Sequence, residues 1–314
     1  DNAGKTSMLV ALNNMYDFED KIQNLKPTIR IDYFQRNFLN LNLNFLDMGG
    51  QRKYREQYLK YSHYFIDLNG FIYLIDIQDE KRYIESIDYL EKVLEILSEK
   101  KLMDISHPIN ICFSKADGEF LSGVETEDKD NSEMLMHLIK KRFPHLSVYF
   151  HYSSIYSIFT ISHLISRVLS QINHHQQLFS EVMTNFIQEF QIPYISLFDD
   201  SGLIVNEEFL KTSDSAIKNL NYDSIISNHL SFSGILKDHK IDLLKNISID
   251  DKLTNNQYQF NLKVQNEITK TFKLKKFFLS LILDKNSNLE YAERLELLLD
   301  RVKEKINELI SPTA

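Results

Sequence analysis

The first seven residues, DNAGKTS, match the downstream half of the pattern GxxxxGK[ST], which places a tight loop between a strand and a helix. In such a loop, backbone N–H groups surround a phosphate, the lysine reaches the β- and γ-phosphates, and the Thr hydroxyl binds Mg²⁺. The helix that we expect over about residues 5–16 would add its positive N-terminal end to the same site. Taken alone, GKTS also suits an ordinary helix start, because Thr and Ser are common near helix N-termini.

A second motif, Asp47-Met48-Gly49-Gly50-Gln51, follows a segment of alternating apolar and polar residues (39–46), the pattern of a half-buried strand. An Asp at the exit of such a strand can hold Mg²⁺ through water. Gly50 has no Cβ, so its N–H can approach a terminal phosphate closely, and Gln51 would orient the attacking water. The alternative is a Gly-Gly turn between a strand and a helix, with a solvated Gln beside it.

Two further segments follow apolar runs and carry groups that can recognise a base. In Ser114-Lys115-Ala116-Asp117, the Asp117 carboxylate can accept hydrogen bonds from the N1–H and exocyclic amino group of guanine, while the Lys115 stem packs over the base. Adenine lacks this donor pair, so Asp117 argues against a P-loop NTPase that uses ATP. Further along, a backbone N–H near Ser154 could meet guanine O6. The alternatives are a strand-end turn with solvated charges at the first segment and a plain serine-rich loop at the second.

Strand and helix patterns alternate along residues 1–173. We expect strands at residues 29–34, 39–46, 71–75, 109–113 and 146–150, and helices at 5–16, 53–65, 81–99, 133–142 and 158–172, with an exposed acidic loop at 118–133. The core face of the helix 81–99 should consist of Ile84, Ile87, Leu90, Leu94 and Leu97. This alternation predicts an α/β fold with a mainly parallel sheet, helices on both faces and a ligand site at the carboxyl ends of the strands.

Composition excludes several classes of protein. The formal net charge of −8 argues against a nucleic-acid-binding protein, whose footprint would be a basic face. The longest apolar candidate, residues 277–283, is far shorter than a membrane span and predicts a buried strand. The single cysteine, Cys112, excludes a disulfide framework and is expected to be a small buried apolar side chain. A length of 314 residues suggests about two domains.

The residues after the first domain follow a different pattern. We expect an interdomain turn at 173–176, a helix at 177–190, a hairpin of strands at 192–198 and 203–205, helical patterns between 213 and 244, a polar stretch at 246–256, strands at 258–264 and 272–283, and an amphipathic helix at 289–310. His174 and His175 could suggest a metal, but no ligand spacing accompanies them, so the turn is preferred.

The order GKTS, PT, DMGGQ, SKAD and SSI resembles that of a Ras-superfamily small GTPase over residues 1 to about 172, and DMGGQ points to its Arf and Rag branches. The segment Pro27-Thr28-Ile29 resembles the first switch of Arf-type proteins, whose Thr binds Mg²⁺ and senses the γ-phosphate. The resemblance implies GTP or GDP and Mg²⁺ as ligands. It assigns nucleotide binding to Asn2, Ala3, Gly4, Lys5, Thr6, Ser7, Thr28, Gly50, Ser114, Lys115, Asp117 and Ser154. It assigns metal binding to Thr6, Thr28 and Asp47, and catalysis to Lys5 and Gln51.

This chain departs from the family pattern at three points. Ser114 stands where the guanine motif begins with Asn, and a hydroxyl there would be tolerated but would weaken base affinity. Leu46 replaces the Trp that often precedes the switch Asp, which should only alter packing. The first glycine of the phosphate loop and the strand before it lie outside this sequence. We expect a central strand at that place in the sheet, and its loss would expose apolar neighbours.

The second domain, residues 174–314, resembles a roadblock domain, an antiparallel sheet with helices on one face, and the FDDSGLI hairpin carries most of the likeness. A GTPase followed by a roadblock domain is the arrangement of Rag-type GTPases. The resemblance implies a homo- or heterodimer with a roadblock-domain protein, GTPase-activating and exchange factors, and a cytoplasmic location. Peripheral membrane recruitment would come through partners or through a lost N-terminus.

The expected activity is slow GTP hydrolysis that a partner accelerates by about 10³- to 10⁵-fold if it supplies an arginine. No internal arginine can be assigned that role, and Arg30, Arg52 and Arg55 are expected to be solvated. A different class of function stays open: an interaction scaffold that holds nucleotide statically or not at all. Comparing the affinities for GTP and GDP, together with a phosphate-release assay, would separate the two.

Overall fold

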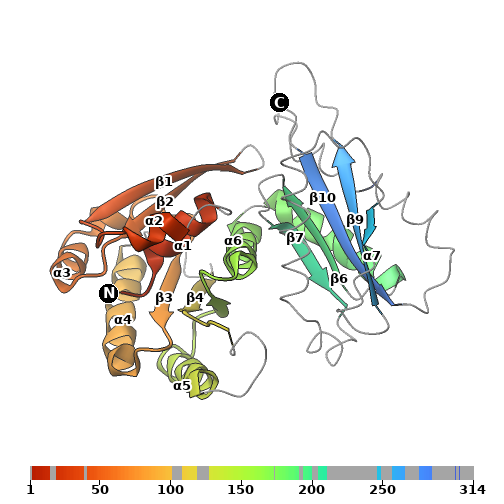
Figure 1. The fold of residues 1–314 in the computed structure, drawn as a ribbon. Helices are drawn as coiled ribbons and strands as arrows, with labels where there is room; N and C mark the ends of the chain where they lie inside the picture. Colours follow the sequence, from red (N-terminus) through yellow and green to blue (C-terminus); the bar gives the residue numbers. More distant parts are fainter. Residues whose placement is uncertain are drawn as a thin grey trace. The chain divides into compact units, whose positions relative to one another are not determined.

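The chain forms two compact units, residues 1–172 and 173–314 (Figure 1). The structure is a computed structural model. It describes residues 2–14, 19–38, 41–100, 108–118, 127–172, 174–190, 194–199, 204–210, 246–248, 257–265, 276–284, 301 and 304. Each unit has its own β-sheet structure and its own core.

The strands of the first unit form two separate sheets. Strands β3 (Ile72–Asp76), β4 (Ile109–Ser114) and β5 (Val148–Ser153) run parallel in that order. Strands β1 (Ile31–Phe38) and β2 (Leu41–Met48) pair antiparallel as a hairpin. The parallel sheet confirms the α/β class that the alternating pattern predicts.

Helices cover both faces of the parallel sheet. The helices of the first unit are α1 (Lys5–Asn13), α2 (Glu19–Gln23), α3 (Arg52–Lys60), α4 (Tyr83–Glu99), α5 (Glu127–Arg142) and α6 (Ile158–Ile172), with short 3₁₀ turns at Ser62–Phe65 and Glu80–Arg82. Alternate residues of β4 face opposite sides, as strand geometry requires. Ile111 and Phe113 join the core formed with α3, α4 and α5, whereas the Asn110 side chain donates a 2.8 Å hydrogen bond to Gln171 of α6.

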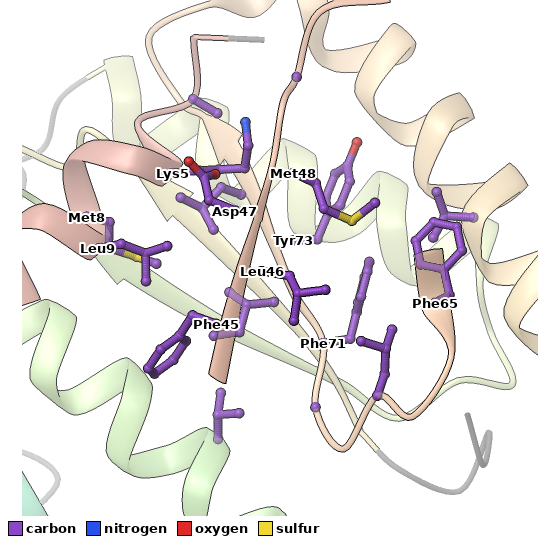
Figure 2. A pocket seen from close by; sticks show the side chains of 18 of the residues that line it. Lys5, Met8, Leu9, Phe45, Leu46, Asp47, Met48, Phe65, Phe71 and Tyr73 are labelled. Atoms are coloured by element: carbon purple, nitrogen blue, oxygen red, sulfur yellow. The ribbon is translucent and has the colours of Figure 1, made fainter. Parts of the chain in front are cut away.

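The facing edges of β2 and β3 line a cavity of about 430 Å³ within the first unit (Figure 2). Its walls are largely apolar and include Leu9 of α1, Phe45 and Leu46 of β2, and Phe71 and Tyr73 at β3.

The described residues of the second unit include the helix α7 (His174–Phe190) and an antiparallel sheet. This helix packs against the β6–β7 hairpin. The sheet has the order β7-β6-β10-β9-β8, with β6 (Tyr194–Asp199), β7 (Ile204–Phe209), β8 (Asn246–Ser248), β9 (Gln257–Gln265) and β10 (Lys276–Asp284). Every neighbouring pair in it is antiparallel.

Several predicted boundaries are wrong for physical reasons. Helix α5 begins at Glu127, not at 133, because acidic side chains stabilise a helix N-terminus as well as they solvate a loop. Strand β1 begins at Ile31, not at 29, because Arg30 has a left-handed φ of 64° that ends extended structure. The expected turn at 173–176 is already helical from His174, and part of the polar stretch 246–256 forms β8.

Side-chain burial corrects one further expectation. Ile84 is predicted in the core face of α4, but it is 61% exposed at the start of the helix, where its neighbour Tyr83 is buried instead. Further along, Val93 is buried and Leu94 is only partly buried. Cys112 is buried, as predicted. The helices predicted at 213–244 and 289–310 lie outside the described residues, apart from Arg301 and Glu304. None of the helices in the described part of the chain has both the length and the apolar composition needed to cross a bilayer.

Candidate functional site

The phosphate loop leads directly into α1. Gly4 is the residue before the first helical turn and has a left-handed φ of 73°, which glycine adopts without steric cost. Asn2 also has a positive φ, 58°, which short polar side chains tolerate best. The N–H groups of the first helical turn, at Lys5, Thr6 and Ser7, have no partner inside the helix. This loop therefore presents a set of backbone donors suited to an anion.

Three oxygen-bearing side chains from distant segments converge beside that loop. Thr6 Oγ1 lies 2.7 Å from Thr28 Oγ1, and the Thr28 hydroxyl donates a 2.9 Å hydrogen bond to Asp47 Oδ2. The Thr6 hydroxyl donates to the same carboxylate oxygen. The second oxygen of Asp47, Oδ1, is buried and has no hydrogen-bond partner in the described part of the chain.

This oxygen cluster fits a hard cation. Mg²⁺ prefers carboxylate and hydroxyl oxygens together with phosphate and water ligands, and it uses one or two carboxylates instead of an all-protein cage. A buried carboxylate oxygen without a donor is costly unless a ligand compensates it. Thr6, Thr28 and Asp47 are the residues that the resemblance assigned to Mg²⁺, and the structure brings all of them together.

Lys5 lines the same cavity as Asp47. Its side chain and the Asp47 carboxylate lie close together at the cavity (Figure 2). Burial lowers the pKa of Lys5, an effect that the Asp47 charge opposes and the Arg55 charge reinforces. A cation held in a partly desolvated place is stabilised strongly when an anion arrives, because the interaction is weakly screened there.

The glycine motif after β2 brings two loops into contact. The Gly49 N–H donates a 2.6 Å hydrogen bond to Arg30 O, and a Cβ at Gly49 would lie only 2.7 Å from Thr28 O. Only glycine permits this approach. Next to it, the Gly50 N–H and the Gln51 side chain have no hydrogen-bond partner among the described residues. They are therefore available to a ligand.

A second polar cluster lies at the carboxyl ends of β3, β4 and β5. The Ser154 hydroxyl donates to Asp117 Oδ1. The Lys115 ammonium forms a 2.5 Å ion pair with Asp76, a buried carboxylate at the end of β3. Ser114 is buried, and its hydroxyl donates a 3.2 Å hydrogen bond to Ile75 O. The structure therefore joins Asp117 with Ser154 but directs Ser114 into the sheet.

The structure narrows the prediction of a backbone N–H near Ser154 that could meet a base oxygen. Its N–H donates a 3.0 Å hydrogen bond to Thr160 Oγ1, so it is already engaged. The next residue, Ile155, donates no backbone hydrogen bond within the described part of the chain. If this loop contacts a base oxygen, Ile155 is the residue whose N–H is available.

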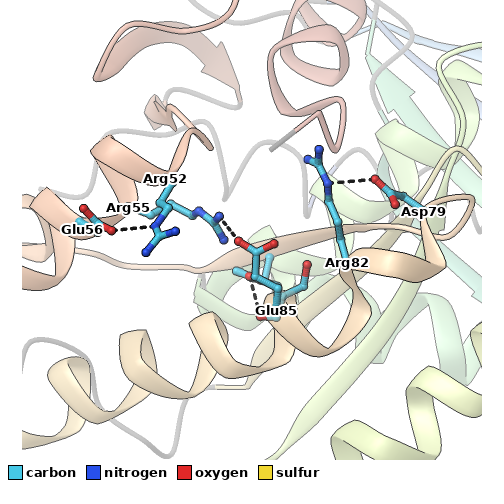
Figure 3. Close-up of polar contacts among 8 residues, drawn as sticks. Arg52, Arg55, Glu56, Asp79, Arg82 and Glu85 are labelled. Atoms are coloured by element: carbon cyan, nitrogen blue, oxygen red, sulfur yellow. Dashed lines mark hydrogen bonds and ion pairs between the residues drawn. The ribbon is translucent and has the colours of Figure 1, made fainter.

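Sequence reasoning missed Arg55, which it placed in solvent. The Arg55 side chain is only 16% exposed, forms an ion pair with Glu85 of α4 and lies 5.2 Å from the centre of the Tyr89 ring (Figure 3). By contrast, Arg52 pairs with Glu56 at the surface (Figure 3). Asp76, the partner of Lys115, was missed as well. No sequence pattern marks either contact, because both partners come from separate elements.

Comparison with known proteins bears on this geometry. A family model described as "Gtr1/RagA G protein conserved region" matches residues 1–230 of the 314. This chain belongs to the Gtr1/RagA family of G proteins. It is a small GTPase of the Rag/Arf type, as the order of its motifs indicated.

More distant relatives are similar to parts of this Gtr1/RagA-family chain. "ADP-ribosylation factor-like protein 3" of Chlamydomonas reinhardtii is 33% identical over 117 residues, which are 37% of this chain and 59% of that protein. This chain therefore spans about three-fifths of that relative's length. Among solved structures, the Arl6 BBS3 small GTPase from Trypanosoma brucei with bound GppNp has a TM-score of 0.40 and 16% identity, over 54% of this chain and 91% of that one. Myxococcus xanthus MglB has a TM-score of 0.29 and 10% identity, over 45% and 97%.

Proposed function

We propose that this protein is a GTP-binding molecular switch that hydrolyses GTP to GDP with Mg²⁺. The observation that carries the proposal is the convergence of Thr6, Thr28 and Asp47. Thr6 is 22 residues from Thr28 and 41 from Asp47, yet their oxygens lie within hydrogen-bond distance of one another. Each comes from a different motif, and together they form an oxygen site beside the phosphate loop.

Each part of the site has a distinct role in this proposal. The N–H groups of the loop and the Lys5 ammonium would bind phosphate oxygens, and Lys5 would neutralise the charge that develops on them during transfer. Gln51, whose amide has no partner among the described residues, would orient the attacking water. Mg²⁺, held by Thr6, Thr28 and Asp47, would supply Lewis-acid neutralisation of the phosphates. These are positioning and electrostatic roles, as phosphoryl transfer requires.

Recognition of guanine would rest on Asp117. Its Oδ1 already accepts the Ser154 hydroxyl, which fixes the orientation of the carboxylate. The ion pair with Asp76 fixes the position of the Lys115 ammonium. A carboxylate in this position can accept from both guanine donors, while adenine would leave it unsatisfied.

The switch would operate through two segments, one around Thr28 and one at residues 47–51. Their contact through Gly49 and Arg30 would be favoured by a γ-phosphate and released after hydrolysis. Turnover without a partner should be slow, and activating and exchange factors would control it. The second unit would serve dimerisation with a roadblock-domain protein. Its antiparallel sheet and the β6–β7 hairpin support this role.

Replacing Gln51 with leucine should leave GTP affinity within about twofold of wild type but slow hydrolysis at least about tenfold, because the side chain keeps its size and loses the amide that positions water. Single-turnover phosphate release with GTP preloaded on the protein measures the effect. Gln57→Leu, the same change further along α3, is the matched control and should hydrolyse at the wild-type rate. Equal rates for wild type and Gln51→Leu would remove Gln51 from the mechanism.

A scaffold function is the second candidate, and the placement of Ser114 favours it. Because this hydroxyl donates to Ile75 O, it can make fewer hydrogen bonds to the base-binding loop than the usual Asn would. A scaffold would bind GTP and GDP equally and release no phosphate, or it would bind neither. Calorimetry with both nucleotides, followed by a phosphate-release assay, distinguishes this outcome from a switch.

A further inference from the structure

Arg30 has a backbone conformation that is unfavourable for an arginine. Its φ of 64° lies in the left-handed region, which carries a steric cost for a residue with a Cβ. Such a conformation persists only where surrounding contacts impose it. Arg30 is two residues after Thr28, so whatever holds Arg30 also determines where Thr28 points.

Two donors from the chain after β2 hold the Arg30 carbonyl. The Gly49 N–H donates at 2.6 Å, and the Tyr58 hydroxyl of α3 donates at 2.5 Å. Tyr58 is 1% exposed, and its ring meets that of Tyr64 edge-on at a centroid distance of 5.2 Å. Burial raises the pKa of Tyr58 to about 12, so the hydroxyl keeps its proton and remains a donor at neutral pH.

We propose that Tyr58 is a positioning residue. Its hydroxyl holds residues 28–30 in the arrangement in which the Thr28 hydroxyl contacts Thr6 and Asp47. It thereby couples helix α3 to the metal site. The proposal rests on the switch function proposed above and names the contact that connects its two segments. Tyr58 lies outside the sequence motifs, and its proposed role requires no direct contact with a ligand.

The contact would make the Thr28 segment bistable. In the observed arrangement, Arg30 bears backbone strain, and its carbonyl accepts both donors. If the segment moves away, the strain is released, but the Gly49 N–H and the buried Tyr58 hydroxyl both lose their shared acceptor, which has a cost comparable to about two hydrogen bonds. Opposing terms of similar size leave the two arrangements close in free energy, so a γ-phosphate needs only a modest differential affinity to select one.

Tyr58→Phe tests this coupling, because phenylalanine keeps the ring and deletes only the donor. In the full-length protein with Mg²⁺, we expect affinity for a non-hydrolysable GTP analogue to fall about five- to tenfold while GDP affinity stays unchanged, since a single buried hydrogen bond specific to one arrangement is lost. Tyr64→Phe is the matched control. It removes a hydroxyl from the other ring of the same pair, and that hydroxyl has no hydrogen bond among the described residues. It should change neither affinity.

A measurement on the wild-type protein needs no variant. Amide exchange at Gly49 should be slower with the GTP analogue than with GDP, because its N–H donates to Arg30 only when the two loops are in contact. A wild-type preference for the GTP analogue that Tyr58→Phe retains in full, or equal Gly49 protection in both states, would overturn the coupling and leave the switch intact. A wild type that binds neither nucleotide would overturn the switch and this inference together.

Discussion

Replacing Lys5 with alanine is expected to reduce the affinity for GTP and GDP by about 100-fold or more, because charge-assisted hydrogen bonds to phosphate are worth roughly 1.5–3 kcal/mol each. The structure adds a reason for a large effect. Lys5 is partly desolvated, with its pKa lowered mainly by burial, so its interaction with phosphate would be weakly screened.

Calorimetric titration of the full-length protein with each nucleotide in the presence of Mg²⁺ measures this loss. Lys141→Ala is a suitable control, because Lys141 is an exposed side chain in the last turn of α5, on a helix outside the site. The control should bind as wild type does. If Lys5→Ala keeps wild-type GTP affinity and a wild-type melting temperature, the phosphate site is not where the loop motif places it.

The convergence of the residues proposed for phosphate and metal could be predicted from sequence, because these residues lie in short motifs that constrain the backbone. Gly4 has the positive φ that the loop requires, and Gly49 makes a contact that a Cβ would block. Thr6, Thr28 and Asp47 were assigned by resemblance to one metal, and their oxygens converge. The parallel strand order follows from the alternation of strands and helices.

What could not be predicted depends on contacts between elements that are distant in sequence. Arg55 looks like any exposed arginine in a polar helix, and only the position of α4 shows that Glu85 and Tyr89 surround it. The sequence indicates a backbone N–H near Ser154 but not which one, and only the structure shows that the Ser154 N–H donates to Thr160 Oγ1. Tyr58 lies in no motif, because its partner is a backbone carbonyl.

In the second unit, too, the pairing of strands that are distant in sequence could not be predicted. The segment Asp199-Asp200-Ser201-Gly202 predicted the β6–β7 hairpin, because Asp and Gly at these positions favour a turn. The pairing of β6 with β10 joins Tyr194 to Ile282, residues that no local pattern connects. Strand β8 lies in a polar segment whose residues show no strand periodicity, so only the structure reveals its pairing with β9.

Replacing Asp117 with asparagine is expected to change the preferred base from guanine to xanthine. An amide offers one acceptor and one donor where the carboxylate offers acceptors only. Guanine would then face the Asn NH₂ with its own amino group, while xanthine has a carbonyl oxygen at that position. Sites built on such complementary hydrogen bonds reject the wrong partner by about 10⁴-fold or more, so GDP affinity should fall by a factor approaching that range.

The structure favours a change of base preference over a loss of base binding. The Ser154 hydroxyl that donates to Asp117 can rotate and accept from the new amide, so the side chain would keep its orientation. Competition between GDP, XDP and ADP for the Asp117→Asn protein measures the change in preference. Asp79→Asn is the control, because this carboxylate follows β3 and pairs at 3.1 Å with Arg82. It should leave the order of preference untouched. An Asp117→Asn protein that still prefers GDP over XDP would show that this carboxylate does not contact the base, and base selection would then have to come from the backbone around Ile155.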